Sequence, residues 1–508
     1  MSAPPVTDPT LARRLRGDLL AAGLTVDGVA ARLGSLASAA LQREQPLPAL
    51  VVTDGATDVS GILLRLFTLG RPVPASALAE ALPGLGVDGA VELGLVRVLH
   101  AGREQEELVE ACCDLRPYAD DTHDWWVASD LSEVATRETL APDHVLGVGG
   151  ASRTLASWTI RRPVRRALDL GVGCGVQALH LADHCGSVVG TDVSERALAF
   201  ASFNAELAGV RLELRRGDLF EPVAGERFDL VVSNPPFVIT PRDGDVPRYE
   251  YRDAGRSGDA LVHSLVRLVG EVLEPGGVAQ FLGNWEVPVG RTWHDVWARW
   301  LGGTGLDAWV VQREVQDPAE YAELWARDGG TVPGTPAHDR MYAAWLRDFA
   351  SRGVESVGFG IVTLQRPRGQ RTPWVALEEI RGPVATPMGP TVEAGLLART
   401  WLAEHTDEQV LSVAWTCAAD VTEERHARPG DRDHCVIVFR QAGGLRRVVS
   451  ADTLLAGYLG VADGSLTAGA ALAALAGVLG LDAVDVRVRV VPRIRELVAG
   501  GLLVRPAG

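Results

Sequence analysis

Lysine is missing from this chain of 508 residues, in which all 49 basic residues are arginine. Acidic residues number 65, so the formal net charge is −16. Proteins that coat nucleic acid nonspecifically gain affinity by neutralising phosphates, and an acidic chain is a poor candidate for that role. A local basic groove is compatible with this balance. We attribute the missing lysine to the composition of the source genome.

Long apolar runs and cysteine pairs are missing as well. No apolar run approaches the roughly 20 residues that cross a bilayer, and the N-terminus lacks a basic segment leading into an apolar stretch. We therefore expect no membrane span, no signal peptide and a cytoplasmic location. The six cysteines include no Cys-x-x-Cys pair, so we expect reduced thiols and no metal site.

Three segments with different patterns divide the chain. Residues 141–368 alternate short apolar strands with helical stretches, which predicts an α/β domain with a parallel sheet and helices on both faces. Residues 1–140 have the pattern of helices followed by a hairpin, and residues 369–508 have a similar character. We expect winged-helix-like α+β domains at both ends. Such domains bind nucleic acid in many proteins and partner proteins in others. Both roles stay open, and so does a cap that serves for substrate docking or dimerisation.

A glycine-rich turn follows the first strand of the middle segment. Glycines at alternate positions let the backbone pass close to a ligand at the carboxyl end of a strand. A dinucleotide fingerprint, Gly-x-Gly-x-x-Gly, would need its third glycine where this chain has Val176. The turn consists of Asp169, Leu170, Gly171, Val172, Gly173, Cys174 and Gly175.

Two further acidic residues follow the next two strands. Asp192 ends the second strand, where a carboxylate can accept both hydrogen bonds of a ribose diol or cap the next helix. Asp218 follows the third strand. Acidic residues after successive strands favour a nucleoside cofactor. A second glycine-rich stretch, 147–150, precedes the first strand and either folds over the cofactor or serves as a linker.

The most specific stretch of the chain, Asn234-Pro235-Pro236-Phe237, follows the fourth strand. A nitrogen in an amide or aromatic amine is conjugated, so its lone pair is a poor nucleophile. Two acceptors that hold its N–H bonds, the Asn234 side-chain oxygen and the Pro235 carbonyl, would draw the nitrogen toward tetrahedral geometry and strengthen as positive charge grows on it. The prolines fix the turn, and Phe237 offers a flat face for stacking.

Together these motifs resemble the Rossmann-like class I methyltransferases that depend on S-adenosyl-L-methionine (SAM), and among them the Asn-Pro-Pro-Phe/Tyr group that methylates planar amino nitrogens. Residues 165–285 are most similar to release-factor glutamine methyltransferases and 16S ribosomal RNA guanine-N2 methyltransferases, although the glutamine enzymes usually have Tyr at the position of Phe237. The resemblance implies SAM as cofactor, bound by Asp169, Gly171, Gly173, Gly175, Asp192, Val193, Asp218, Leu219 and Asn234. By the same resemblance, Asp169 and the glycine turn hold the methionine end, Asp192 the ribose and Asp218 the adenine amino group.

The identity of the methyl acceptor stays open at this point. The resemblance implies an RNA base or a protein glutamine, and the alternatives are a small molecule or peptide in a biosynthetic pathway and a noncatalytic SAM-binding regulator. The intact catalytic motif disfavours the regulator, which has no need of the acceptor pair. A polar loop after the motif suits substrate contact, so the candidate substrate-binding residues are Phe237, Tyr251 and Arg256.

Overall fold

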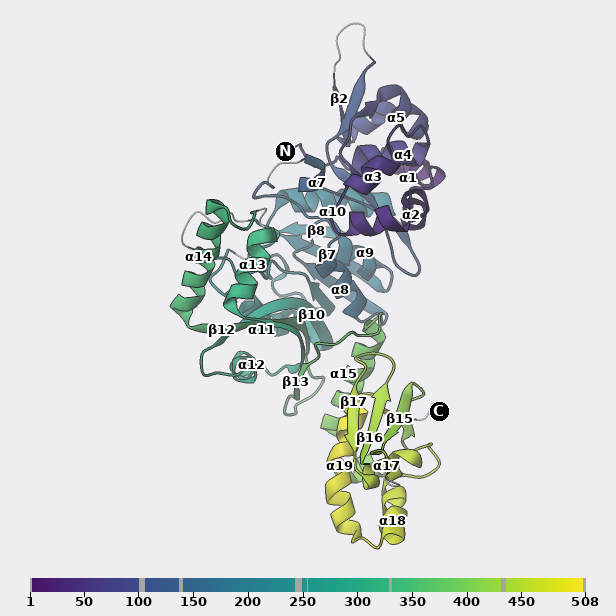
Figure 1. Cartoon of the computed structure of the whole chain (residues 1–508), viewed down its shortest axis with the longest axis vertical. Helices are drawn as coiled ribbons and strands as arrows, with labels where there is room; N and C mark the ends of the chain where they lie inside the picture. Colours follow the sequence, from purple (N-terminus) through teal and green to yellow (C-terminus); the bar gives the residue numbers. More distant parts are fainter. Residues whose placement is uncertain are drawn as a thin grey trace. The chain divides into compact units, whose positions relative to one another are not determined.

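A computed structural model of the chain (Figure 1) describes residues 2–99, 106–136, 140–242, 249–253, 255–328, 331–430 and 435–505. The chain divides into two compact units. The first consists of Met1–Ala156, Pro163–Thr304 and Glu314–Arg366, and the second of Ser157–Arg162, Gly305–Arg313 and Pro367–Gly508. The predicted division into three domains stays a prediction.

The first unit is organised around strands in the spatial order β12-β10-β9-β6-β7-β8. Neighbours pair in parallel, except that β10 and β12 are antiparallel. Because the chain runs from β6 to β7 and β8 on one side and places β9 on the other side of β6, a switch point lies between β6 and β9, where open α/β sheets bind ligands. The bounds are β6 Val164–Leu170, β7 Cys185–Asp192, β8 Glu213–Arg216, β9 Phe228–Ser233, β10 Leu273–Pro288 and β12 Val354–Gln365. The predicted Rossmann-like α/β fold is confirmed.

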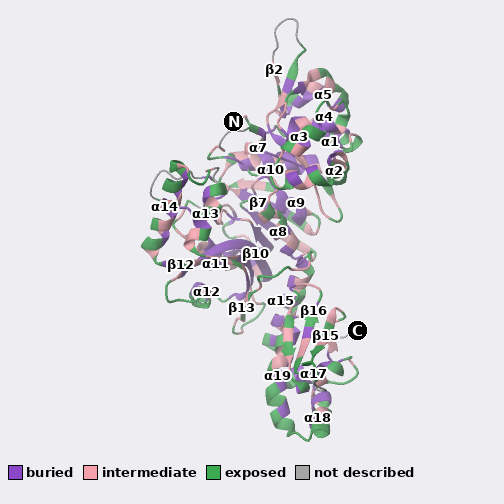
Figure 2. Cartoon of the chain, in the orientation of Figure 1, coloured by how far each residue is buried: buried purple, intermediate pink, exposed green. Residues whose placement is uncertain are grey.

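Helices connect these strands and begin at the residues that local chemistry favours. Ser194 caps α10 by accepting the Ala197 N–H, and Gly209 ends that helix in a left-handed conformation. The buried residues lie along the strands, as Figure 2 shows for β10. The helices are α8 Gly150–Trp158, α9 Val176–Ala182, α10 Glu195–Ala208, α11 Ala260–Val272, α12 Trp293–Leu301, α13 Pro318–Asp328 and α14 Pro336–Arg352, with a 3-10 turn at Glu221–Val223.

The N-terminal part of the first unit combines short helices with two small antiparallel sheets, β1-β3-β2 and β4-β5. The helices are α1 Pro9–Ala21, α2 Val26–Gln42, α3 Leu47–Val52, α4 Val59–Leu63, a π-helical turn Leu64–Thr68, α5 Ala75–Ala81, α6 Gly86–Glu92 and α7 Glu133–Thr136. The strands are β1 Val73–Pro74, β2 Val96–Leu99, β3 Leu108–Ala111, β4 Asp114–Ala119 and β5 Asp124–Ser129.

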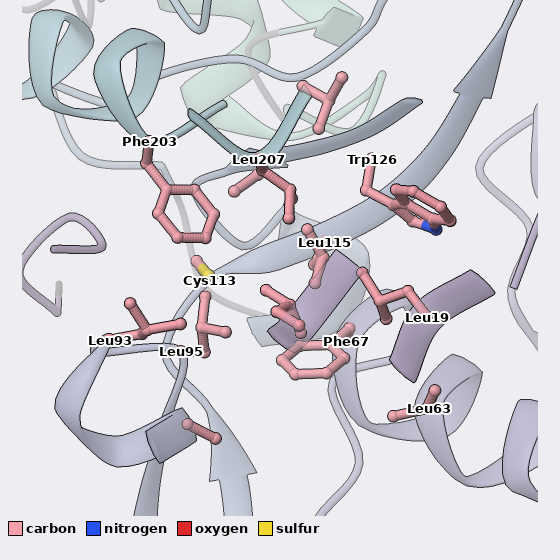
Figure 3. Packing of buried hydrophobic residues seen from close by; sticks show 14 of the residues in the cluster. Leu19, Leu63, Phe67, Leu93, Leu95, Cys113, Leu115, Trp126, Phe203 and Leu207 are labelled. Atoms are coloured by element: carbon pink, nitrogen blue, oxygen red, sulfur yellow. The ribbon is translucent and has the colours of Figure 1, made fainter. Parts of the chain in front are cut away.

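One hydrophobic core joins these N-terminal elements to helix α10 (Figure 3). Phe203 and Leu207 of α10 are in the same buried cluster as Phe67 and Leu115. Asn204, fully buried between them on the same helix, accepts the Ala128 N–H at 2.7 Å and donates to the carbonyls of Ala128 and Cys174, each at 2.8 Å. The amide therefore ties β5 to the glycine-rich turn. Because buried amides cost free energy unless they are paired, this junction is specific as well as apolar.

The second unit has its own core, which includes Trp415, Tyr458 and Ile494. Its main sheet is β15-β16-β17, and β11 pairs in parallel with β13. The winged-helix prediction for the two ends of the chain is not confirmed. The elements are β11 Asp307–Gln316, β13 Val375–Glu379, α15 Gly389–Glu404, α16 Asp407–Leu411, β14 Thr416–Cys417, β15 Val421–His426, β16 Val436–Gln441, β17 Val448–Ala451, α17 Thr453–Gly460, α18 Ala468–Leu479, α19 Ala483–Ala499 and β18 Leu503–Val504.

Within the described residues, no single helix is long and apolar enough to cross a membrane, whereas α1 and α2 taken together, bent by 44°, meet the length and composition required. Both helices contribute side chains to the buried clusters of the N-terminal part.

Candidate active site

A cavity of about 390 Å³ lies at the carboxyl ends of β6, β7 and β9 in the first unit. This is the switch point of the sheet, so the cavity has the place that the fold gives to a ligand. Its lining residues lie in the segments 143–147, 170–177, 191–197, 217–219, 233–236 and 250–253, with Ser152, Gly255, Leu261 and Leu265.

The glycine-rich turn adopts a conformation that only glycine accommodates without strain. Gly171, Gly173 and Gly175 have φ angles of +73°, +53° and +93°. No atom lies within 4 Å of the position that a Cβ would take at Gly171 or Gly173, and both residues line the cavity. The turn therefore leaves open space beside its backbone, as the predicted cofactor requires.

Asp192 holds the glycine turn and the start of α10 together. Its Oδ2 accepts the Gly173 N–H at 2.9 Å, and its Oδ1 accepts the Ser194 N–H at 2.9 Å. Burial raises the pKa of this carboxyl, and the backbone N–H groups oppose that rise. Each carboxylate oxygen has a second lone pair, so Asp192 can accept ribose hydroxyls while it keeps both backbone contacts. Its neighbour Val193 also lines the cavity.

Asp169, the second-last residue of β6, is not among the described residues that line the cavity. It is 1% exposed, and burial raises the pKa of its carboxyl well above the usual range. A backbone hydrogen bond from Ala178 anchors it to α9. Its Oδ2 has no hydrogen-bond partner in the part of the chain that the structure describes. Such an orphaned acceptor is costly, and a bound amino group or water would satisfy it.

Asp218 and Leu219 form the wall of the cavity after β8. Leu219 has a φ of +46°, which is uncommon for a branched side chain. Arg256, predicted as a substrate contact, does not line the cavity; its Nη2 lies 3.1 Å from Asp218 Oδ2. The structure thus brings a predicted acceptor-binding residue and a predicted cofactor-binding residue together.

The Asn-Pro-Pro-Phe loop presents an amide oxygen without a hydrogen-bond partner among the described residues. Asn234 donates from its amide nitrogen to the Ser152 hydroxyl at 3.4 Å, and its buried Oδ1 accepts no hydrogen bond from any described residue. The preceding residue is fixed because the Ser233 hydroxyl donates to the Leu170 carbonyl at 2.7 Å. Asn234, Pro235 and Pro236 all line the cavity.

Phe237 lies outside this wall. Its ring packs against Phe359 of β12, with 5.3 Å between the ring centroids, beside a buried cluster that includes Trp345. The aromatic rings that line the cavity belong to His144 and Tyr251, whose centroids are 5.9 Å apart. Burial lowers the pKa of His144 and raises the pKa of Tyr251, so both rings are neutral near pH 7.

No sequence motif predicts that His144 lines the cavity. The glycine-rich stretch 147–150 beside it is the nearest sequence signal. Asp130 fixes the segment around His144 by accepting the Val145 N–H at 2.8 Å while it pairs with Arg196 of α10. On the other side of the cavity, the Glu250 N–H donates to the Pro142 carbonyl at 2.8 Å. The segment therefore closes against the loop that carries Tyr251.

The loop after the catalytic motif is fixed by a buried carboxylate. Asp253 accepts the Tyr249 N–H at 2.6 Å and the hydroxyl of Thr240. The Val238 N–H donates to the Arg252 carbonyl at 3.1 Å. Tyr251 is thus held beside the residues that directly follow Phe237.

Acidic side chains line the wall of the cavity. None of the lining residues that the structure describes is an arginine, and five are acidic: Asp143, Asp192, Asp218, Glu250 and Asp253. Such a wall repels an anionic ligand and accepts a neutral or cationic one.

Comparisons with known proteins support the methyltransferase resemblance for the middle of the chain. Residues 147–294 match the family model described as methyltransferase small domain, and residues 21–106 match a domain of unknown function, DUF7059. The first match confirms the predicted resemblance to methyltransferases.

Three relatives have informative names. A release factor glutamine methyltransferase of Geobacter sulfurreducens is 37% identical over 29% of this chain and 54% of its own. A ribosomal protein uL3 glutamine methyltransferase of Xylella fastidiosa is 34% identical over 34% of this chain and 59% of its own. The ribosomal RNA small subunit methyltransferase C of Alcanivorax borkumensis is 32% identical over 24% of this chain and 33% of its own. The chain spans about half the length of the first of these relatives.

Proposed function

We propose that this protein is a SAM-dependent N-methyltransferase that methylates a planar amino nitrogen of a macromolecule, and that the acceptor is a protein glutamine. The observation that carries the proposal is the buried, unpaired amide oxygen of Asn234 at the wall of the cavity. A buried acceptor without a partner is a cost that a bound N–H group would remove. The names of the relatives agree with this chemistry.

The residues present fit the cofactor. The open turn at Gly171 and Gly173, together with Asp169, would receive its methionine end. Asp192 has free lone pairs for the ribose, and Asp218 follows β8 on the adenine side. Bound SAM supplies an electrophilic methyl group on a sulfonium. We expect Val193 and Leu219 to flank the bound nucleoside, because both line the same wall.

Asn234 and Pro235 would perform the activation. The Asn234 side-chain oxygen and the Pro235 carbonyl accept the two N–H bonds of the target nitrogen. Both contacts strengthen as positive charge develops on that nitrogen, so they favour the transition state over the ground state. Hydrogen bonds to a charged group contribute about 1.5–3 kcal/mol each, which for two corresponds to roughly 10²–10⁴-fold in rate. Holding the nitrogen in line with the methyl group supplies a further proximity gain.

The acceptor plane would stack on Tyr251 and His144. Phe237 was expected to provide this face, but its ring packs on Phe359. Two neutral rings suit an uncharged amide, and the acidic wall disfavours a phosphate-rich strand. These features favour a protein glutamine over an RNA base. The cytoplasmic location stays a prediction.

The proposal is tested by incubating the protein with methyl-labelled SAM and separated protein, RNA and small-molecule fractions. We expect label in protein, and its release as methylamine on acid hydrolysis, because N5-methylglutamine yields glutamate and methylamine. The Asn234→Ala variant serves as the control for background label. Label in RNA would replace the glutamine assignment with a base amino group, and label in the small-molecule fraction would point to a biosynthetic acceptor. Binding of SAM without transfer to any fraction would overturn the enzyme proposal in favour of a regulator.

A further inference from the structure

We propose that Arg256 is a positioning residue for adenine recognition: it holds Asp218 so that one carboxylate oxygen faces the 6-amino group of the cofactor. The inference rests on the proposed SAM-dependent function, because it needs an adenosine cofactor at this site. It also replaces the sequence-based expectation that Arg256 contacts the methyl acceptor.

The guanidinium of Arg256 bridges two elements that are far apart in sequence. Its Nη2 lies 3.1 Å from Asp218 Oδ2, in the turn after β8. Its Nη1 donates to the Ser264 hydroxyl of α11, also at 3.1 Å. The Ser264 hydroxyl in turn donates to the Ala260 carbonyl at 2.8 Å, so α11 fixes the far end of the bridge.

Asp218 needs such a support because little else constrains its side chain. The side chain is 55% exposed, and the described residues offer no hydrogen bond to its Oδ1. A carboxylate that rotates freely loses side-chain entropy when it binds a ligand. Arg256 occupies Oδ2 and therefore restricts the rotation, which leaves Oδ1 as the oxygen available to an N–H donor. The planar guanidinium is suited to this task because its donors have fixed directions.

The position of Arg256 in the chain argues for the same role. Asp218 lines the cavity, whereas Arg256 is not among the described residues that line it. Arg256 follows the loop that presents Tyr251, yet its side chain contacts Asp218 in the turn after β8. A residue that touched the acceptor would have to face the cavity.

The test compares two ligands that differ only at the 6-position of the purine. One is S-adenosyl-L-homocysteine, and the other is its analogue with unsubstituted purine, which lacks the amino group. Calorimetric titration gives the preference of each protein variant for the first over the second. We expect the wild type to prefer the adenine ligand by about tenfold or more, because a hydrogen bond to a carboxylate is lost with the analogue.

We expect Asp218→Ala to abolish the preference and Arg256→Met to reduce it to about threefold or less. Arg256→Lys should give an intermediate value, because one ammonium cannot reach Asp218 and Ser264 together. Arg211→Met is the matched control: this exposed arginine shortly before β8 carries the same charge, and we expect its preference to equal that of the wild type. A melting temperature for each variant verifies folding, and Ser264→Ala tests the same bridge without touching a charge.

An Arg256→Met variant that keeps the wild-type preference, while Asp218→Ala loses it, would overturn the positioning role alone. An unchanged preference in both variants would show that adenine is not recognised here. If the wild type binds neither ligand, the proposed function fails, and this inference fails with it.

Discussion

Asn234 donates its amide nitrogen to the Ser152 hydroxyl at 3.4 Å, and this contact turns its amide oxygen to a buried position without a partner. Ser152 lies on α8, before the first strand of the sheet, and Asn234 follows the fourth parallel strand along the chain, β9. The proposed catalytic oxygen, Asn234 Oδ1, is therefore oriented by a residue outside the motif. An oxygen oriented in advance costs no reorganisation when charge develops, which is the basis of strong electrostatic catalysis.

Replacing Asn234 should separate binding from turnover. We expect Asn234→Ala to lower kcat by about 10- to 10²-fold, because one of two transition-state acceptors is removed. The dissociation constant for S-adenosyl-L-homocysteine should stay within about threefold of the wild type. Single-turnover kinetics with labelled SAM and a titration measure the two quantities. Asn234→Asp keeps an acceptor oxygen and should retain more activity than Asn234→Ala. Equal turnover in the wild type and the alanine variant would contradict the mechanism.

Ser152 should affect the same step more weakly. Without its hydroxyl, the Asn234 amide is free to rotate, and we expect Ser152→Ala to lower kcat by about three- to tenfold with little change in cofactor affinity. Ser257→Ala is the control, since Ser257 is an exposed serine of the loop after the catalytic motif. A loss in the control as large as that in Ser152→Ala would refute the orienting role.

Tyr251 should act on the acceptor and not on the cofactor. We expect Tyr251→Leu to raise the KM for the methyl acceptor by about two- to tenfold, because aromatic contacts contribute roughly 0.5–1.5 kcal/mol beyond buried area. Tyr251→Phe keeps the ring and should behave like the wild type. Steady-state kinetics with the labelled protein fraction measure the change. Equal KM values for the leucine and phenylalanine variants would assign the stacking face elsewhere.

Asn204 should contribute to stability at the junction of the N-terminal part and the glycine-rich turn. Asn204→Leu leaves the buried N–H and carbonyl of Ala128 and the carbonyl of Cys174 unpaired, and we expect a loss of about 2–4 kcal/mol in unfolding free energy. Urea unfolding followed by far-UV circular dichroism measures it. Ser202→Ala, on the same helix, removes only a hydrogen bond with Thr7 and should cost under about 1 kcal/mol. Similar losses in both variants would contradict the specific role of the amide.

Asp259 should make stability depend on pH. Burial, and then the nearby Glu286, raise its pKa from 3.8 to about 6, while the Glu286 N–H opposes the rise. The folded state therefore binds this proton more tightly than the unfolded state. Its contribution to stability is fully present below about pH 4 and is lost as the pH rises to about 6, by up to roughly 3 kcal/mol.

The Asp259→Asn variant isolates this effect, because the amide oxygen can still accept the Glu286 N–H, which lies 2.8 Å from the carboxylate in the wild type. We expect Tm to fall more in the wild type than in the variant between pH 4.5 and 7, and differential scanning calorimetry measures both. Parallel Tm profiles would show that Asp259 titrates normally.

The sequence predicted the parts of the site that are local. The glycine turn, Asp192 and the Asn-Pro-Pro stretch each follow a strand directly, so strand order alone brings them to one edge of the sheet. The sequence did not predict contacts that depend on tertiary pairing. Phe359 lies on β12, and no sequence motif predicts that β12 pairs antiparallel with β10. The ring of Phe237 packs against Phe359 and not against the cavity. His144 reaches the cavity because Asp130 and Arg196 hold its neighbour, and these residues are separated by 66 positions.

The shared interior around Asn204 limits where the chain can be divided. The family-matched stretch, 147–294, contains α10 but neither the β5 backbone that pairs with Asn204 nor Phe67 and Leu115 of the same buried cluster. Gene rearrangement that moved this stretch alone would carry an exposed apolar helix face into its new context. A chimaera designed at the family boundary would therefore be cut through the hydrophobic core that the N-terminal elements share with α10.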